Sequence, residues 1–122
     1  MPKLDVLIRV ENADTKDEYK TTAILADDII KYKSNNNTTE VFDYNSYKLT
    51  RENDELRMEY EFDLNNITRG NLFIKELNRS LVVDIKTNKI ERNNNDIKIE
   101  FVAEDNNIKY QIEVIKWVYI QS

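Results

Sequence analysis

The side chains best suited to binding chemistry are tyrosines and an arginine at positions where apolar residues would continue an alternating pattern. Tyr19, Tyr32 and Tyr60 share the parity of the apolar residues around them. Arg51 does the same in its own segment. An inward phenol offers a hydroxyl beyond an apolar ring, and an inward guanidinium holds an anionic group through two parallel hydrogen bonds. The sequence therefore predicts that any ligand contacts Tyr60, with Tyr32 or Arg51 supplying polarity.

A plainer interpretation of the same residues stays open. Tyrosines on an apolar face more often pack in a core, with their hydroxyl groups at its rim, than contact a ligand. Arg51 ends its segment beside Glu52 and Asp54, which favours a solvent-exposed ion pair. Arg69 stands beside the single glycine of the chain in the longest irregular connection, 64–70. There it could close one end of the fold, although simple exposure is the plainer expectation.

Composition excludes most catalytic and metal chemistry. The chain has no histidine and no cysteine, so it has neither a Ser-His-Asp triad nor a zinc site built from those residues. A single glycine leaves no glycine-rich phosphate loop. Most carboxylates alternate with apolar residues and are predicted to face solvent. We predict no catalytic residue, no metal site and no cofactor, and the remaining enzyme alternative would use carboxylate, lysine or tyrosine chemistry.

The net charge of the chain limits the classes of molecule that we expect it to bind. The 18 Lys and Arg residues against 23 Asp and Glu residues give a net charge of −5, and both signs are interspersed. An acidic chain without a basic stripe is repelled by phosphate backbones and anionic lipid surfaces, so we expect neither nucleic acid nor membrane as a partner. A small apolar or amphipathic molecule fits the inward tyrosines better. A protein partner or a homodimer stays open.

The expected location is the cytoplasm. The absence of cysteine suits a reducing compartment. The first residues contain no apolar core of the kind that a signal peptide needs, and no apolar run approaches the length of about 20 residues that a membrane helix needs.

Alternation of apolar and polar residues predicts that these side chains are positioned by β-strands. In 56–62 the apolar parity is that of Leu56, Met58, Tyr60 and Phe62, while Arg57, Glu59 and Glu61 take the other face. In the last segment the apolar parity changes after Val114, which indicates a bulge or a strand apolar on both faces. One helical turn within 63–80 is an alternative. The expected strands are 4–10, 19–25, 30–32, 39–44, 47–51, 56–62, 72–75, 80–86, 89–92, 97–101 and 108–120.

So many short strands would leave long unpaired edges in one open sheet, so closure is expected. Hairpin-length turns favour an up-and-down meander. We predict a single all-β domain over 1–122, an antiparallel meander closed into a barrel of about eight to ten strands. The interior of such a barrel is either filled by side chains or holds one small ligand.

The order of these segments, and the residues of 51–62, 81–90 and 97–101, resemble the YwiB-like family of uncharacterised bacterial proteins. The resemblance implies a calycin-like barrel, related in shape to lipocalins and streptavidin, and it brings no established activity or binding residue. We therefore expect a non-enzymatic calycin-like barrel that binds a small apolar or amphipathic ligand inside. A structural or protein-interaction barrel with a filled core is the alternative.

The charge pattern yields a direct test. We expect no salt-sensitive, submicromolar affinity for single-stranded DNA or RNA, because the acidic chain releases few counterions on contact with phosphates. Fluorescence anisotropy titration at physiological salt measures this, and tight binding that weakens with added salt would contradict the expectation.

Overall fold

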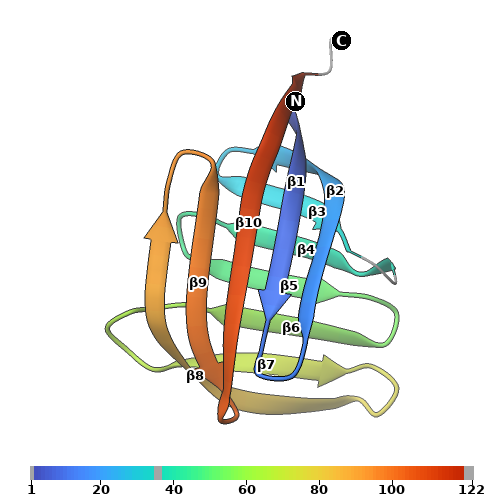
Figure 1. Ribbon diagram of the computed structural model, residues 1–122. Helices are drawn as coiled ribbons and strands as arrows, with labels where there is room; N and C mark the ends of the chain where they lie inside the picture. Colours follow the sequence, from blue (N-terminus) through green and yellow to red (C-terminus); the bar gives the residue numbers. More distant parts are fainter. Residues whose placement is uncertain (1, 35–36, 120–122) are drawn as a thin grey trace.

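The computed structural model describes residues 2–34 and 37–119. Within them, ten strands form one closed antiparallel barrel, in which each strand pairs with its neighbours in sequence and β1 pairs with β10 to complete the circuit (Figure 1). The strands are β1 (Pro2–Glu11), β2 (Lys16–Ala26), β3 (Ile29–Lys33), β4 (Thr39–Asp43), β5 (Lys48–Glu52), β6 (Leu56–Glu61), β7 (Thr68–Ile74), β8 (Arg79–Arg92), β9 (Asp96–Ala103) and β10 (Asn106–Tyr119).

The all-β meander barrel expected from the sequence is confirmed, with local corrections. Residues 80–86 and 89–92 belong to one strand, β8, which continues through a register shift between Thr87 and Lys89. The connection expected over 64–70 is shorter, since β7 already begins at Thr68. Arg69 therefore lies in a strand and not in that connection, and its side chain is exposed, which agrees with the plainer expectation.

The helical alternative for 63–80 is also wrong, because this stretch holds β7, a tight turn and the start of β8. The described residues contain no helix that is long and apolar enough to cross a membrane.

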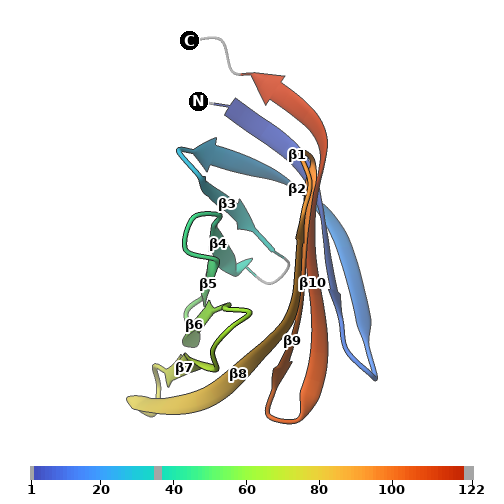
Figure 2. The same ribbon diagram turned by 90° about the vertical axis from the view of Figure 1, so that its left-hand side faces the viewer.

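The barrel has two walls of different strand length. The long strands β1, β2, β8, β9 and β10 form one wall, and the short strands β3 to β7 are stacked opposite them (Figure 2). Of the long strand β2, only residues 23–26 pair with β3, and of β8 only residues 79–85 pair with β7. Beyond these paired lengths, residues of β2 and β8 contact the short-strand wall along two borders, here called the β2 seam and the β8 seam.

Side chains close the seams where the backbone ladder stops. At the β8 seam the amide of Asp63 donates to Thr87 Oγ1 at 3.2 Å, and Thr87 is buried. The guanidinium of Arg92 lies 5.0 Å from the ring centroid of Tyr44. At the β2 seam the hydroxyl of Thr21 donates to the carbonyl of Lys33 at 3.0 Å. The two walls are thus joined by specific polar contacts as well as by strand pairing.

The faces of the strands follow the predicted parity. Phe62, just after β6, is buried, and the other three apolar residues of the alternation are partly buried. On the opposite face Arg57 and Glu61 are exposed, and Glu59 is partly buried. The predicted bulge in β10 is also present. Asp5 pairs with Lys116 and Val6 with Val114, so Ile115 is the extra residue and its side chain is exposed.

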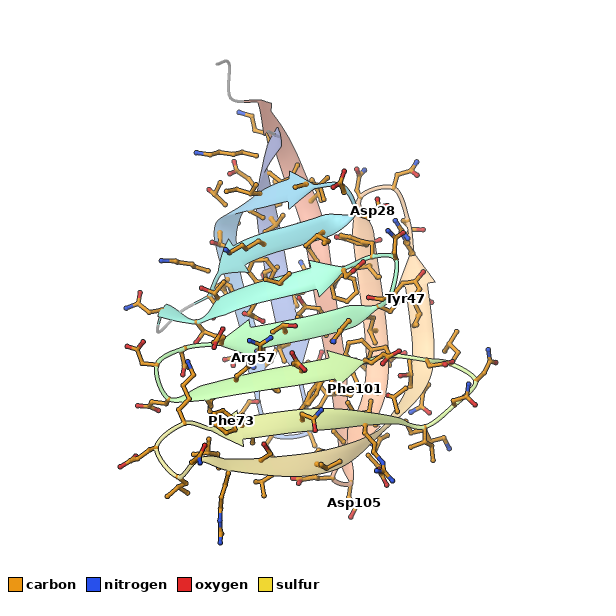
Figure 3. All side chains as sticks on the ribbon, turned by 180° about the vertical axis from the view of Figure 1, so that it is seen from behind. Asp28, Tyr47, Arg57, Phe73, Phe101 and Asp105 are labelled. Carbon is orange, nitrogen blue, oxygen red and sulfur yellow. The ribbon has the colours of Figure 1, made fainter. Side chains whose placement is uncertain are left out.

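Side chains from both walls fill the interior. The ring centroids of Phe62 and Phe101 are 4.7 Å apart, and those of Phe42 and Tyr110 are 6.1 Å apart. Figure 3 shows Phe101 behind the short strands, on the long-strand wall. The buried core consists of Leu4, Val6, Ile8, Ala23, Ile30, Tyr32, Phe42, Leu49, Phe62, Val83, Ile85, Ile97, Ile99, Phe101, Ala103, Tyr110 and Ile112.

Gly70 makes room for the ring of Tyr60 in this core. A Cβ atom at position 70 would lie 2.6 Å from Tyr60 Cδ1 and 2.9 Å from Ile85 Cδ1, distances that no side chain tolerates. The glycine serves a close approach between neighbouring strands, which is a recognised use of glycine within a strand.

Gly70→Ala should therefore lower the free energy of unfolding by about 1–3 kcal/mol, because the added methyl group forces Tyr60 or Ile85 out of its place. Urea unfolding monitored by circular dichroism measures the change. The matched control is Asn71→Ala, the exposed neighbour on the same strand, which should change stability by no more than about 0.5 kcal/mol. Equal denaturation midpoints for the two variants would contradict this account of the glycine.

Candidate functional site

The most unusual side chain of the interior is the carboxylate of Glu40 on β4. Its side chain is only 3% exposed. Burial of a carboxylate is strongly unfavourable unless hydrogen bonds and a counter-charge replace water. The hydroxyl of Tyr19 donates to Glu40 Oε2 at 2.8 Å, and that of Tyr32 lies 3.5 Å from Oε1. Arg51 Nε is 3.3 Å from Oε1 and supplies the counter-charge.

Sequence reasoning missed Glu40, although a signal was present. Glu40 stands on the parity of Phe42 and Tyr44, and the sequence makes that parity the apolar one in this segment. A charged residue on an apolar face calls for a buried partner, and the inward tyrosines and Arg51 were candidates for that role. The partners come from β2, β3 and β5, which only the closed barrel brings around β4.

The hydroxyl groups extend the cluster to the opposite wall. Tyr32 on β3 and Tyr110 on β10 share a hydrogen bond between their hydroxyl oxygens, and both side chains are buried. Burial, and then the negative charge of Glu40, raise the pKa of Tyr19 and of Tyr110. Burial is also the main cause of the raised pKa of Tyr32. The three phenols are therefore protonated near neutral pH and act as hydrogen-bond donors within the cluster.

Arg51 is the link between this cluster and solvent. The sequence favoured an exposed ion pair with Glu52 or Asp54, and that expectation is wrong. Glu52 instead lies within ion-pair distance of Arg57 and of Lys75. The Arg51 Nε atom is buried against Glu40 without a well-aligned hydrogen bond, although 41% of the side chain is exposed. Its inner end is thus fixed inside the barrel and the rest reaches an opening.

That opening is a pocket at the ends of β4, β5 and β6, beside the β5–β6 turn. Its volume is about 580 Å³. Asn53 shapes one side, since its Nδ2 donates to Thr38 Oγ1 at 3.2 Å. The lining combines one guanidinium, two apolar side chains and several polar groups, namely Asn37, Thr38, Arg51, Asn53, Asp54, Glu55, Leu56 and Met58. The pocket is therefore mainly polar, with a small apolar surface at Leu56 and Met58.

Of the three predicted contact residues, the structure brings two together. Tyr32 and Arg51 meet at Glu40, and Arg51 alone of the three lines the pocket. Tyr60 belongs to an aromatic cluster, with its ring centroid 5.9 Å from that of Phe101 and 6.5 Å from that of Phe62. Burial raises the pKa of Tyr60.

Both oxygens of Glu40 are engaged, Oε2 by the hydroxyl of Tyr19 and Oε1 by Arg51 and the hydroxyl of Tyr32. Within residues 2–34 and 37–119, no three or more acidic side chains are grouped so as to hold a metal ion.

The comparisons with known proteins concern the fold. No protein-family model and no curated protein matches the chain. The crystal structure of the ywiB protein from Bacillus subtilis is similar, with a TM-score of 0.55 over 94% of this chain and 92% of that chain, at 11% sequence identity. The YwiB-like barrel indicated by the sequence is therefore present at the level of the fold.

The protonated tyrosines predict a loss of stability at alkaline pH. Above about pH 10 the unfolded chain releases phenolic protons that the folded barrel retains, so the free energy of unfolding falls as the pH rises. Tyr32→Phe removes one such group and should make this decline less steep, whatever its effect at neutral pH. Urea unfolding at a series of pH values between about 8 and 11 measures both slopes. Parallel slopes for the variant and the parent would show that Tyr32 does not retain its proton.

Proposed function

We propose that the protein is a non-enzymatic barrel that binds a small amphipathic molecule in the pocket beside the β5–β6 turn. The observation behind the proposal is the position of Arg51, whose guanidinium lies where the filled interior meets this open pocket. A cation at such a place can receive the polar end of a ligand without entering the core. The expected site inside the barrel thus becomes a site at one end.

The anchoring of Arg51 favours binding. Glu40 holds the inner edge of the guanidinium, and Tyr19 and Tyr32 hold Glu40. Among the described residues, no hydrogen-bond acceptor is aligned with the terminal amino groups of Arg51. A guanidinium positioned in advance loses less conformational entropy when a ligand binds.

The apolar part of the ligand would lie against Leu56 and Met58, which are partly buried in the pocket lining. In this proposal Arg51 contacts the ligand and Tyr32 acts through Glu40. Tyr60 supports the barrel through its aromatic cluster. The proposal includes a cytoplasmic location and no nucleic-acid or membrane partner, on the grounds of the cysteine-free composition and the net charge of −5.

A second candidate function is a protein-interaction module with a filled core. Several large apolar side chains are exposed around β7, in the β6–β7 connection before it, in the β7–β8 turn at its other end and at the start of β8. They are Leu64, Ile67, Leu77, Leu81 and Val82. We take these exposed apolar side chains as the candidate surface for a contact with another protein or a second copy of the chain. Analytical ultracentrifugation of the purified protein distinguishes a monomer from a homodimer.

Binding in the pocket can be mapped by nuclear magnetic resonance. Three probes share an unbranched apolar tail: hexanoate, pentylamine and L-norleucine. We expect at least one of them to shift the amide resonances of 37–38 and 51–58 in a saturable manner. Arg51→Lys should weaken that binding about tenfold, because lysine retains the charge but not the planar pair of donors.

The matched control is Arg57→Lys, which changes an arginine on the outer face of β6 (Figure 3) and should leave the affinity unchanged. Thermal melts show whether each variant remains folded. The absence of shifts with all three probes would overturn the proposal, as would shifts confined to 64–82, which would favour the interaction module.

A further inference from the structure

The pocket contains charges of both signs, and only the positive one is balanced. The charge of Arg51 is compensated by Glu40 at 3.3 Å. Asp54 and Glu55 line the same pocket with exposed side chains, and no lysine or arginine of the described residues lies within ion-pair distance of either carboxylate. The side chains that line the pocket therefore carry one positive and two negative charges, and the ammonium of Lys75, which donates to the carbonyl of Asn53 at 2.8 Å, lies beside the same turn.

The two free carboxylates stand on a well-held turn. Asn53 Oδ1 accepts hydrogen bonds from the amides of Glu55 and Leu56, at 2.8 and 3.0 Å. The carbonyl of Glu55 accepts a hydrogen bond from the amide of Lys75 at 2.9 Å. The backbone that positions Asp54 and Glu55 is thus tied both to its own turn and to the end of β7.

We propose that the ligand is a zwitterion with an apolar tail, such as an amino acid with an unbranched side chain. Its carboxylate would bind the terminal amino groups of Arg51, its ammonium group would face Asp54 and Glu55, and its tail would lie on Leu56 and Met58. The inference rests on the proposed function, because it assigns the polar end of the molecule that the pocket binds.

Ligands with a single charge fit the same pocket less well. A simple carboxylate would pair with Arg51 but would meet the uncompensated charge of Asp54 and Glu55, and the net charge of −5 adds to the repulsion. A simple amine would be attracted by the two carboxylates but would leave the donors of Arg51 without an acceptor from the ligand. A zwitterion satisfies both sets of groups without adding net charge.

The three probes isolate each charge. Hexanoate is norleucine without the ammonium group, and pentylamine is norleucine without the carboxylate, so the apolar tail is nearly constant. Titrations followed by amide chemical shifts at low ionic strength give the three affinities. We expect L-norleucine to bind more tightly than either singly charged probe, by up to about fivefold, as expected for one additional exposed ion pair.

Charge-neutral variants assign the ammonium contact. Asp54→Asn combined with Glu55→Gln should remove most of the advantage of norleucine over hexanoate. The matched control is Glu104→Gln combined with Asp105→Asn, an acidic pair in the β9–β10 turn, away from the pocket (Figure 3). This control makes the same change in net charge, so it should preserve the order of affinities.

The titrations distinguish the proposal of a zwitterionic ligand from the proposal that the pocket binds a small molecule at all. Tighter binding of norleucine that depends on Asp54 and Glu55 supports both proposals. If hexanoate or pentylamine binds at the pocket as tightly as norleucine, the zwitterion is wrong and the binding function stands. The same conclusion follows if the control variant removes the preference as fully as the pocket variant. If none of the probes shifts the pocket amides, both proposals fail.

Discussion

The burial of one negative charge shapes much of this barrel. A carboxylate with a side chain only 3% exposed is tolerated because two phenols and a guanidinium replace its water. Those partners reside on three other strands, and Tyr110 adds a fourth through its bond to Tyr32. Removal of one partner from a buried ion pair typically costs about 3–5 kcal/mol, so Glu40 penalises any closure of the barrel that separates these strands.

This requirement matters most at the β2 seam, where strand pairing is incomplete. Only residues 23–26 of β2 have partners in β3, so backbone hydrogen bonds alone fix little of the contact between the rest of β2 and the short strands. The bond from Tyr19 on β2 to Glu40 on β4 connects strands that are not neighbours in the sheet. A polar contact of fixed geometry then specifies an arrangement that apolar packing alone would leave less defined.

The difference between local patterns and contacts of distant strands explains which features the sequence could predict. Alternation has a period of two and is local, so the faces of 56–62 and the bulge after Val114 follow from neighbouring residues. The meeting of Tyr32 with Tyr110 joins residues 78 positions apart and depends on the register of the closed barrel. The prediction of an irregular connection that includes Gly70 was wrong for a different reason. The glycine suggested a loop, whereas its cause is the ring of Tyr60 on the adjacent strand.

A filled interior and a binding function are compatible because Arg51 belongs to both environments. Its Nε atom faces the buried Glu40, and the exposed remainder of the side chain lines the pocket. A ligand carboxylate could share the guanidinium without displacing Glu40, since the tyrosine hydroxyl groups continue to stabilise that buried charge. The cluster that joins the strands of the barrel therefore also keeps Arg51 in place at the pocket, so the proposed binding role of Arg51 does not compete with its role in the fold.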